Sequence, residues 1–318
     1  MRNRSGDVSV ALDVDREAVP DDTPVMTDDG SLDHEISVNG VTLAVEEFGR
    51  RGDPTIVLVA GGASPRDWWD AELCRRLARG DGSGSRRVLR YDFRDTGRST
   101  TVPPGEATYR ASDLVDDLAA LIEEMDAAPT HVVGLSMGGG LAQELALGRP
   151  ELLASLTLVA TTAARSLPGS GELPPSEPRV TEAFGSGDGG PDWSNPDAVG
   201  DHLVHVERLL GGTIPVDEER VRRIAADIVA RSIDPASADN HWMIEEGEVA
   251  PGELSAIDIP TLVLHGSHDP LFPLPHGEAL AAAIPGARLV VIPGMGHQFL
   301  PPETWDLVVP ELLHHTAS

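Results

Sequence analysis

One residue type is absent from the sequence and another occurs only once, and both facts limit the chemistry that the chain can carry out. It contains no lysine, because all 24 basic residues are arginine, and its 52 acidic residues give a formal net charge of −28. Without lysine, neither a Schiff-base nucleophile nor a phosphate-loop lysine is available. Nucleic-acid binding needs clustered cations, so this charge argues against a nucleic-acid partner.

Cysteine and long apolar runs are also scarce. Cys74 is the single cysteine, so it cannot form an internal disulfide, and its helical context ELCRRLARG predicts a packing role. No stretch approaches about 18 uninterrupted apolar residues, and the N-terminus lacks the basic and then apolar pattern of a secretory signal. We therefore expect a cytoplasmic protein with no membrane partner.

The composition changes along the chain and predicts four segments. We expect an acidic, disordered tail over 1–33, a first part of the core over 34–162, an inserted lid over 163–252 and a second part of the core over 253–318. The tail is rich in acidic residues, Ser, Thr and Pro without sustained periodicity. In the insertion, Pro/Gly/Ser-rich loops lead to helical patterns near 197–211 and 216–231, which is typical of a lid beside a sheet edge.

Short apolar runs alternate with helical patterns in the two core segments. The stretch HEISVNGVTLAVEEFG predicts an antiparallel hairpin that turns at Asn39-Gly40. Buried strands are then expected within 55–62, 86–95, 130–136, 153–161, 259–269 and 287–297. This rhythm predicts an α/β fold with a mostly parallel central sheet flanked by helices.

One flanking helix is expected over residues 111–125. Apolar side chains recur along one face of this segment, and Ser112 is a candidate N-cap. The predicted core-facing positions are Leu114, Leu118, Leu121 and Ile122.

A serine stands between two glycines where a predicted strand passes into a predicted helix. The stretch Gly134-Leu135-Ser136-Met137-Gly138 has the G-x-S-x-G spacing of a nucleophile elbow, in which small neighbours let a strained serine project above the sheet. The helix that follows directs its positive N-terminal end toward this serine. The alternative is a glycine-rich turn with an incidental serine, and the strand–turn–helix context favours the elbow.

A serine hydroxyl needs a positioned base, and that base needs an orienting carboxylate. Asp269 follows the strand in LVLHGSHDP, and His297 follows the next strand in LVVIPGMGHQF. The order Ser136, Asp269, His297 is that of α/β-hydrolases. All three residues follow parallel strands, whose carboxyl ends form the sites of open α/β sheets.

Other residues compete for these roles. His268 adjoins Asp269 but is expected at the surface, His265 is expected to pack at the strand end, and Asp92 is expected as a structural partner in a turn. His202 and His205 have the spacing of a weak metal pair without an obvious third ligand. We therefore expect neither a metal nor a cofactor.

Negative charge that develops on a substrate oxygen would meet backbone N–H groups. One such donor is expected from Met137, directly after the nucleophile, and the other from AGGAS after the 55–62 strand. Gly62 is favoured as the second donor and Ala63 remains open, with a plain flexible turn as the alternative to both.

Together, the stretches GLSMGG, RYDFRDTGRST, LVAGG, LHGSHDP and IPGMGH resemble the α/β-hydrolase superfamily. The resemblance covers roughly residues 34–316, is strongest to the aclacinomycin methylesterase group, and is weak in the lid. Members of that group remove a methyl ester from an aromatic polyketide glycoside. The likeness implies that Ser136 is acylated, His297 shuttles protons, Asp269 orients it, and Gly62 and Met137 form the oxyanion hole.

The resemblance implies a small-molecule ester as substrate. Trp193 and Trp242 are the candidate substrate contacts, although the lid aromatics, which include Phe184, are too sparse to define a cavity. A serine nucleophile disfavours haloalkane dehalogenation and epoxide hydrolysis, where resembling families carry aspartate. The same three residues would also serve a cofactor-free perhydrolase, a C–C hydrolase or an acyltransferase, and a non-catalytic small-molecule-binding signalling protein is the alternative outside enzymology.

Overall fold

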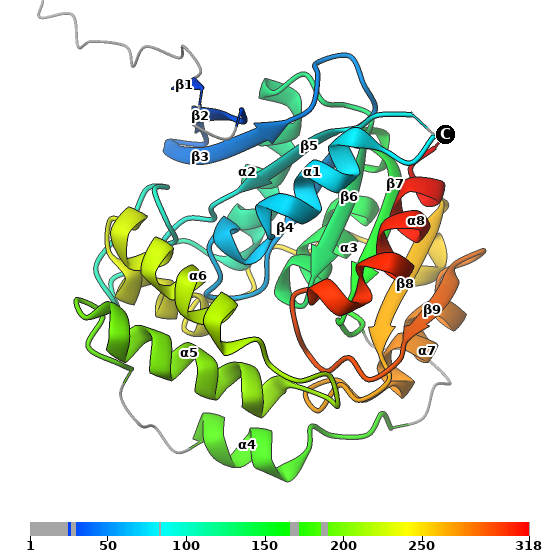
Figure 1. Ribbon diagram of the computed structural model, residues 1–318. Helices are drawn as coiled ribbons and strands as arrows, with labels where there is room; N and C mark the ends of the chain where they lie inside the picture. Colours follow the sequence, from blue (N-terminus) through cyan, green and yellow to red (C-terminus); the bar gives the residue numbers. More distant parts are fainter. Residues whose placement is uncertain (1–24, 27–29, 83, 166–171, 186–189, 318) are drawn as a thin grey trace, which may run out of the picture.

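Figure 1 shows the computed structural model of the chain, which describes residues 25–26, 30–82, 84–165, 172–185 and 190–317. The expected tail lies largely outside these residues. Within it, Val25–Met26 forms the short strand β1, which pairs with the start of β2. In the described part of the chain, no helix is both long and apolar enough to span a membrane.

The described strands form one nine-stranded sheet in the order β1-β2-β3-β5-β4-β6-β7-β8-β9. The first three pairs of this order, β1 with β2, β2 with β3 and β3 with β5, are antiparallel. Every later pair of neighbours, from β5 with β4 to β8 with β9, is parallel. Their bounds are β2 Leu32–Val38, β3 Val41–Phe48, β4 Thr55–Val59, β5 Arg87–Tyr91, β6 Thr130–Leu135, β7 Leu153–Val159, β8 Thr261–Gly266 and β9 Arg288–Ile292. Every strand expected from the sequence is confirmed.

The central strands are buried along their whole length. This applies to β4, β5, β6 and β8, because helices cover both faces of the sheet. Strand β5 nevertheless carries two arginines. Arg87 Nε lies 2.9 Å from Glu47 Oε1 and Arg90 Nη2 lies 2.6 Å from Glu46 Oε2, so carboxylates from the neighbouring strand β3 compensate both buried charges.

Helices α1 and α8 pack on one face of the sheet, and α2, α3 and α7 pack on the other (Figure 1). The bounds are α1 Ala71–Arg79, α2 Ala111–Glu124, α3 Met137–Gly148, α7 Pro275–Ala283 and α8 Trp305–His315. Cys74 is buried in α1, as expected. The four predicted apolar positions of α2, Leu114, Leu118, Leu121 and Ile122, are fully buried.

The predicted cap of α2 is wrong. Arg110 is the N-cap, and its N–H donates to the Asp113 carboxylate at 2.7 Å. The N–H groups of Ala111 and Ser112 donate to the carbonyl oxygens of Glu245 and Glu246 at 2.8 and 2.9 Å. Backbone carbonyls from the insertion therefore satisfy the start of this helix, and no local pattern around Ser112 could predict that.

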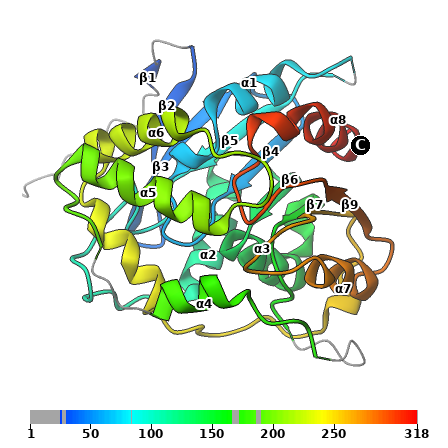
Figure 2. The same cartoon turned by 60° about the horizontal axis from the view of Figure 1, so that its bottom comes forward.

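The insertion forms helices at the carboxyl ends of the strands, below the sheet in Figure 1 and toward the viewer in Figure 2. The two predicted helices are confirmed as α5 Pro196–Leu210 and α6 Glu218–Arg231, and α4 Pro178–Gly185 and the 3-10 helix η3 Pro235–Trp242 were not predicted. Side chains of α5 and α6 form a separate apolar cluster with Trp68 of the core. This cluster comprises Trp68, Val204, Val221, Ile224 and Ile228.

Candidate active site

Ser136 occupies the sharp turn between β6 and α3. Its φ of 52° and ψ of −118° lie outside the regions that non-glycine residues ordinarily adopt. Two hydrogen bonds hold this conformation: the Ser136 N–H donates to the Val159 carbonyl at 3.0 Å, and the Thr161 hydroxyl donates to the Ser136 carbonyl at 2.8 Å. Both partners belong to or follow β7, so the next strand fixes the turn.

The two glycines around Ser136 are required by close backbone approach. A Cβ on Gly134 would lie 2.3 Å from the Gly138 carbonyl oxygen, and a Cβ on Gly138 would lie 2.3 Å from the Ala60 carbonyl oxygen. Any larger residue at either position would push α3 away from the sheet. The G-x-S-x-G spacing is thus explained by packing, and it brings the start of α3 against the loop after β4.

The structure brings Ser136, His297 and Asp269 together in one hydrogen-bonded chain. Ser136 Oγ lies 2.9 Å from His297 Nε2, and His297 Nδ1 lies 2.9 Å from Asp269 Oδ2. Because a carboxylate only accepts, Nδ1 must carry a proton, and a neutral ring then leaves Nε2 free to accept the serine proton. This is the geometry that a serine nucleophile with a histidine base requires.

The Asp269 carboxylate is buried but strongly supported. Its second oxygen accepts the N–H groups of Leu271 and Phe272 at 2.9 and 2.8 Å. Burial alone would raise its pKa, but the charge and hydrogen bond of His297 and the Phe272 N–H hold the pKa below its ordinary value. Asp269 is therefore ionised at neutral pH and can stabilise a protonated His297.

The loop that carries His297 rests on the insertion. The His297 N–H donates to the Leu210 carbonyl at 2.7 Å, and the Thr213 N–H donates to the Gly294 carbonyl at 2.8 Å. A Cβ on Gly296 would lie 2.3 Å from the same Leu210 oxygen. The end of α5 therefore helps to place the histidine of the site.

The loop after β4 lies beside Ser136. A Cβ placed on Gly61 would lie 3.6 Å from the Ser136 Cβ. In this loop the N–H of Ala63 donates to His241 Nδ1 at 3.0 Å. The Ala63 N–H therefore already has an acceptor within the protein. Met137 opens α3, so its N–H has no acceptor within the helix.

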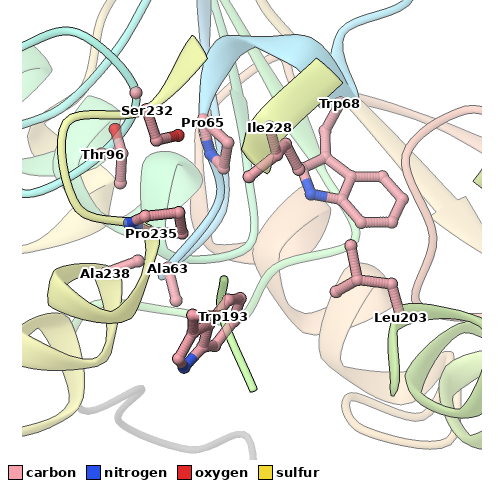
Figure 3. A pocket seen from close by; sticks show the side chains of 11 residues that line it. Ala63, Pro65, Trp68, Thr96, Trp193, Leu203, Ile228, Ser232, Pro235 and Ala238 are labelled. Carbon is pink, nitrogen blue, oxygen red and sulfur yellow. The ribbon is translucent and has the colours of Figure 1, made fainter. Parts of the chain in front are cut away.

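A pocket of about 350 Å³, which includes the open space at its mouth, lies between this loop and the insertion. Figure 3 shows Trp68, Ile228 and Leu203 on one side and Thr96, Ser232 and Pro235 on the other, with Trp193 between them. Ala63 of the loop after β4 lines the pocket, whereas Ser136 is not among the residues that line it. The pocket is thus a largely apolar space next to the loop after β4.

The two tryptophans proposed as substrate contacts lie at different places. Trp193 lines the pocket and meets His202 edge to face, with ring centroids 6.2 Å apart. Trp242 is 64% exposed, and its ring lies so close over Gly62 that a Cβ there would be 2.5 Å from it. Phe184 is exposed.

The competing residues form no hydrogen bond with Ser136 or His297, although His265 Nε2 lies 3.8 Å from Asp269 Oδ2. His268 is exposed and bonds Ser267, and buried His265 donates to the Phe272 carbonyl at 2.7 Å. Asp92 acts as a turn partner that accepts the N–H groups of Arg66 and Arg98. Over the described ranges of the chain, no three His, Cys, Asp or Glu side chains are grouped to hold a metal ion.

Three residues near the site were not predicted from the sequence. His241 holds the loop after β4, and Phe272 packs its ring edge to face on His297 at 5.4 Å. Glu207 of α5 is buried, which raises its pKa, and accepts a hydrogen bond from Gln298 beside His297. His241 and Glu207 act across the boundary between insertion and core, and Phe272 acts from the loop after β8, where sequence spacing carries no signal.

The model of the alpha/beta hydrolase fold family matches residues 54–303. The chain is similar to a rhodomycin D methylesterase from Streptomyces sp. strain C5, with 32% identity over 89% of this chain and 97% of that protein. A rhodomycin D methylesterase from Streptomyces peucetius is 31% identical over the same shares. The predicted resemblance to methylesterases of this fold is thereby confirmed.

The fold also recurs in solved structures. The 2-hydroxy-6-oxo-6-phenylhexa-2,4-dienoate hydrolase from Rhodococcus sp. strain RHA1 superposes with a TM-score of 0.68, over 91% of this chain and 99% of that one. Its sequence is only 18% identical, so this likeness concerns the fold alone.

Proposed function

The chain belongs to the α/β-hydrolase fold family, and from this premise we propose that it hydrolyses a carboxylic ester through an acyl-serine intermediate on Ser136. The hydrogen-bonded chain from Ser136 through His297 to Asp269 carries the proposal. A hydroxyl 2.9 Å from a neutral imidazole nitrogen can lose its proton as it attacks. The residues therefore support nucleophilic catalysis without a metal or a cofactor.

In the first half-reaction, Ser136 Oγ attacks the ester carbonyl carbon while its proton passes to His297 Nε2. Asp269 keeps the imidazole in place and stabilises its positive charge. The tetrahedral intermediate then collapses, the bond to the alkoxy oxygen breaks, and His297 returns the proton to the leaving alcohol. The acid remains as an ester on Ser136.

In the second half-reaction, water replaces the alcohol and the same steps release the carboxylic acid. In both halves, the negative charge on the former carbonyl oxygen requires preformed donors. We assign these to the N–H groups of Gly62 and Met137, which flank Ser136 from the loop after β4 and from the start of α3. The engagement of Ala63 by His241 supports Gly62 in this assignment.

The relatives named as rhodomycin D methylesterases suggest a methyl ester of a polyketide-type secondary metabolite as substrate. The pocket beside Ala63 offers an apolar surface to the acyl part, because Trp68, Ile228 and Leu203 line it. Trp193 in the pocket and Trp242 over Gly62 are the residues that we assign to substrate contact. The methyl group, in contrast, needs little space.

We also propose that residues 163–252 act as a lid and that 34–162 and 253–318 form the hydrolase core. The helices of the insertion lie at the carboxyl ends of the strands, where Ser136, Asp269 and His297 are found (Figures 1 and 2). Opening this layer would expose the pocket to solvent. Closing it would exclude water from the acylation step.

Intact-mass spectrometry after exposure to a small fluorophosphonate tests the nucleophile. Wild type should gain one adduct and Ser136→Ala none, while both retain the same circular dichroism spectrum. Methyl esters of aromatic polyketides would then be screened for release of methanol. A folded wild type that gains no adduct, or a Ser136→Ala variant that still turns over ester, would overturn the proposal.

A further inference from the structure

His241 connects the insertion to the loop that faces the substrate oxygen. It belongs to η3, and its Nδ1 accepts the N–H of Ala63 at 3.0 Å. Its other nitrogen, Nε2, lies 2.8 Å from the carbonyl oxygen of Arg94. One imidazole thus joins the loops that follow β4 and β5.

These two partners define the protonation state of the ring. The Ala63 N–H is a donor, so Nδ1 must offer its lone pair, and the Arg94 carbonyl only accepts, so Nε2 must carry the proton. A doubly protonated ring would place an N–H against the Ala63 N–H. Only the neutral Nε2–H form makes both hydrogen bonds.

The surroundings of His241 maintain this neutral form. The side chain is only 5% exposed, and Phe93 packs edge to face on it with centroids 5.7 Å apart. Burial lowers the pKa of His241, although the Arg94 carbonyl and the charge of Asp95 oppose that effect. Asp95 is the charged side chain that acts on the ring, and it is itself bonded to Tyr109 and Asn240.

The Ala63 backbone needs such support. Its φ of 54° lies in the left-handed region that a residue with a Cβ rarely adopts. Rotation of the peptide between Gly62 and Ala63 would relieve this strain by changing φ of Ala63 together with ψ of Gly62, and it would displace the Gly62 residue whose N–H is assigned to the oxyanion hole. The hydrogen bond from Ala63 to His241 opposes that rotation.

From these contacts we propose that His241 is a positioning residue, which locks the Ala63 peptide so that the Gly62 N–H faces the developing oxyanion. This inference rests on the proposed esterase function and deepens it. It assigns to the insertion a part in the geometry of the oxyanion hole, in addition to covering the pocket. His241 itself touches neither the substrate nor the reacting atoms.

Two substitutions distinguish the hydrogen bond of His241 Nδ1 from that of His241 Nε2. In His241→Asn, the amide oxygen replaces Nδ1 and can still accept from Ala63. In His241→Gln, the amide nitrogen replaces Nε2 and can still donate to Arg94, but the acceptor for Ala63 is lost. His241→Ala removes both contacts.

The readout is the affinity for an alkyl trifluoromethyl ketone, which adds to Ser136 as a hemiketal oxyanion, together with kcat and KM for the best methyl ester found. Loss of a whole oxyanion donor costs about 10²–10³ in kcat. Since His241 acts indirectly, His241→Gln and His241→Ala should weaken ketone binding and kcat by about tenfold or more, with little change in KM. His241→Asn should retain most of both.

Asn240→Ala is the matched control. Asn240 anchors the same 3-10 helix to Gly105 and Asp95 rather than to the loop after β4. The Asn240→Ala variant should have a lower Tm than wild type, but its affinity for the trifluoromethyl ketone should not fall as it does in His241→Gln. Equal losses in the Asn and Gln variants, or unchanged ketone affinity in His241→Ala, would overturn the role of His241.

A separate measurement keeps this result distinct from a failure of the proposed function. If fluorophosphonate labels wild type normally but the His241 variants behave alike, only the positioning role is wrong. If wild type gains no adduct, the proposed function fails and the positioning role fails with it. The ¹⁵N shifts of His241 must also report the Nε2–H tautomer, and the opposite tautomer would contradict the proposal without any activity assay.

Discussion

At the scale of single residues, the site depends on keeping one buried carboxylate charged. Asp269 is 3% exposed, yet it accepts three hydrogen bonds, from His297 and from the N–H groups of Leu271 and Phe272. These bonds replace the water that burial removes and favour the ionised form. The negative charge then stabilises His297 when it holds the serine proton.

Asp269→Asn should reduce kcat by about 10⁴-fold, the order found when the carboxylate of such a triad is neutralised. The amide can present an N–H to His297 Nδ1, which would favour the tautomer in which Nε2 cannot accept the serine proton. Turnover of the best ester measures the loss. His268→Ala, a change at the exposed neighbour, should leave turnover unchanged, and equal effects of both variants would contradict this role of Asp269.

The same scale shows what the sequence can and cannot predict. Ser136, Asp269 and His297 follow strands in an order tied to a known topology, so their proximity was predictable from local patterns. His241 lies in NHW within a segment without periodicity, and its partner Ala63 is 178 positions away. Nothing in a single sequence links these two residues.

At the scale of elements, helix α3 approaches the sheet more closely than a side chain would permit. Gly138 and Gly139 face the loop after β4 and Thr161, whereas a Cβ on Gly140 would meet nothing within 4 Å. The three consecutive glycines therefore differ in their roles. Only the contact positions fix the helix against the sheet and set the direction of its N-terminus.

Gly138→Ala should destabilise the fold by about 1–3 kcal/mol, because overpacking displaces the helix or the Ala60 carbonyl, and it should also abolish ester turnover. Gly140→Ala, two residues along the same helix, should stabilise the fold by about 0.5–1 kcal/mol through helix propensity. Urea denaturation of both variants measures the difference. Equal destabilisation by the two changes would refute the close-approach argument.

The pairing of β3 with β5 predicts a pH-dependent stability. Burial alone would raise the pKa of Glu47, but the neighbouring His34 and Arg87 lower it to about 2 from an ordinary 4.5. Because the folded pKa is depressed, ionised Glu47 stabilises the fold above about pH 5, and this contribution is lost as the pH falls toward 2. The Tm gap between wild type and Glu47→Gln should therefore be widest near neutral pH and should close in acid. A gap independent of pH would contradict the assignment.

At the scale of the whole molecule, the insertion is tied to the core through charges as well as apolar contacts. Arg231 at the end of α6 pairs with Asp67 and with Asp92, whose side chain is fully buried. The sequence predicted helices near these positions and a turn role for Asp92. It could not predict the pairing, because Arg231 and Asp92 are 139 positions apart.

Arg231→Met should destabilise the protein by about 3–5 kcal/mol, since it removes the cation that is hydrogen-bonded to the buried Asp92 carboxylate. Arg223→Met on the same helix breaks the exposed pair with Glu219 and should cost less than about 1 kcal/mol. Urea denaturation followed by far-ultraviolet circular dichroism and tryptophan fluorescence measures both. If insertion and core unfold together, circular dichroism and fluorescence give the same urea midpoint. That midpoint should shift clearly in Arg231→Met and little in Arg223→Met. A stable Arg231→Met variant would show that Asp92 does not need its partner from the insertion.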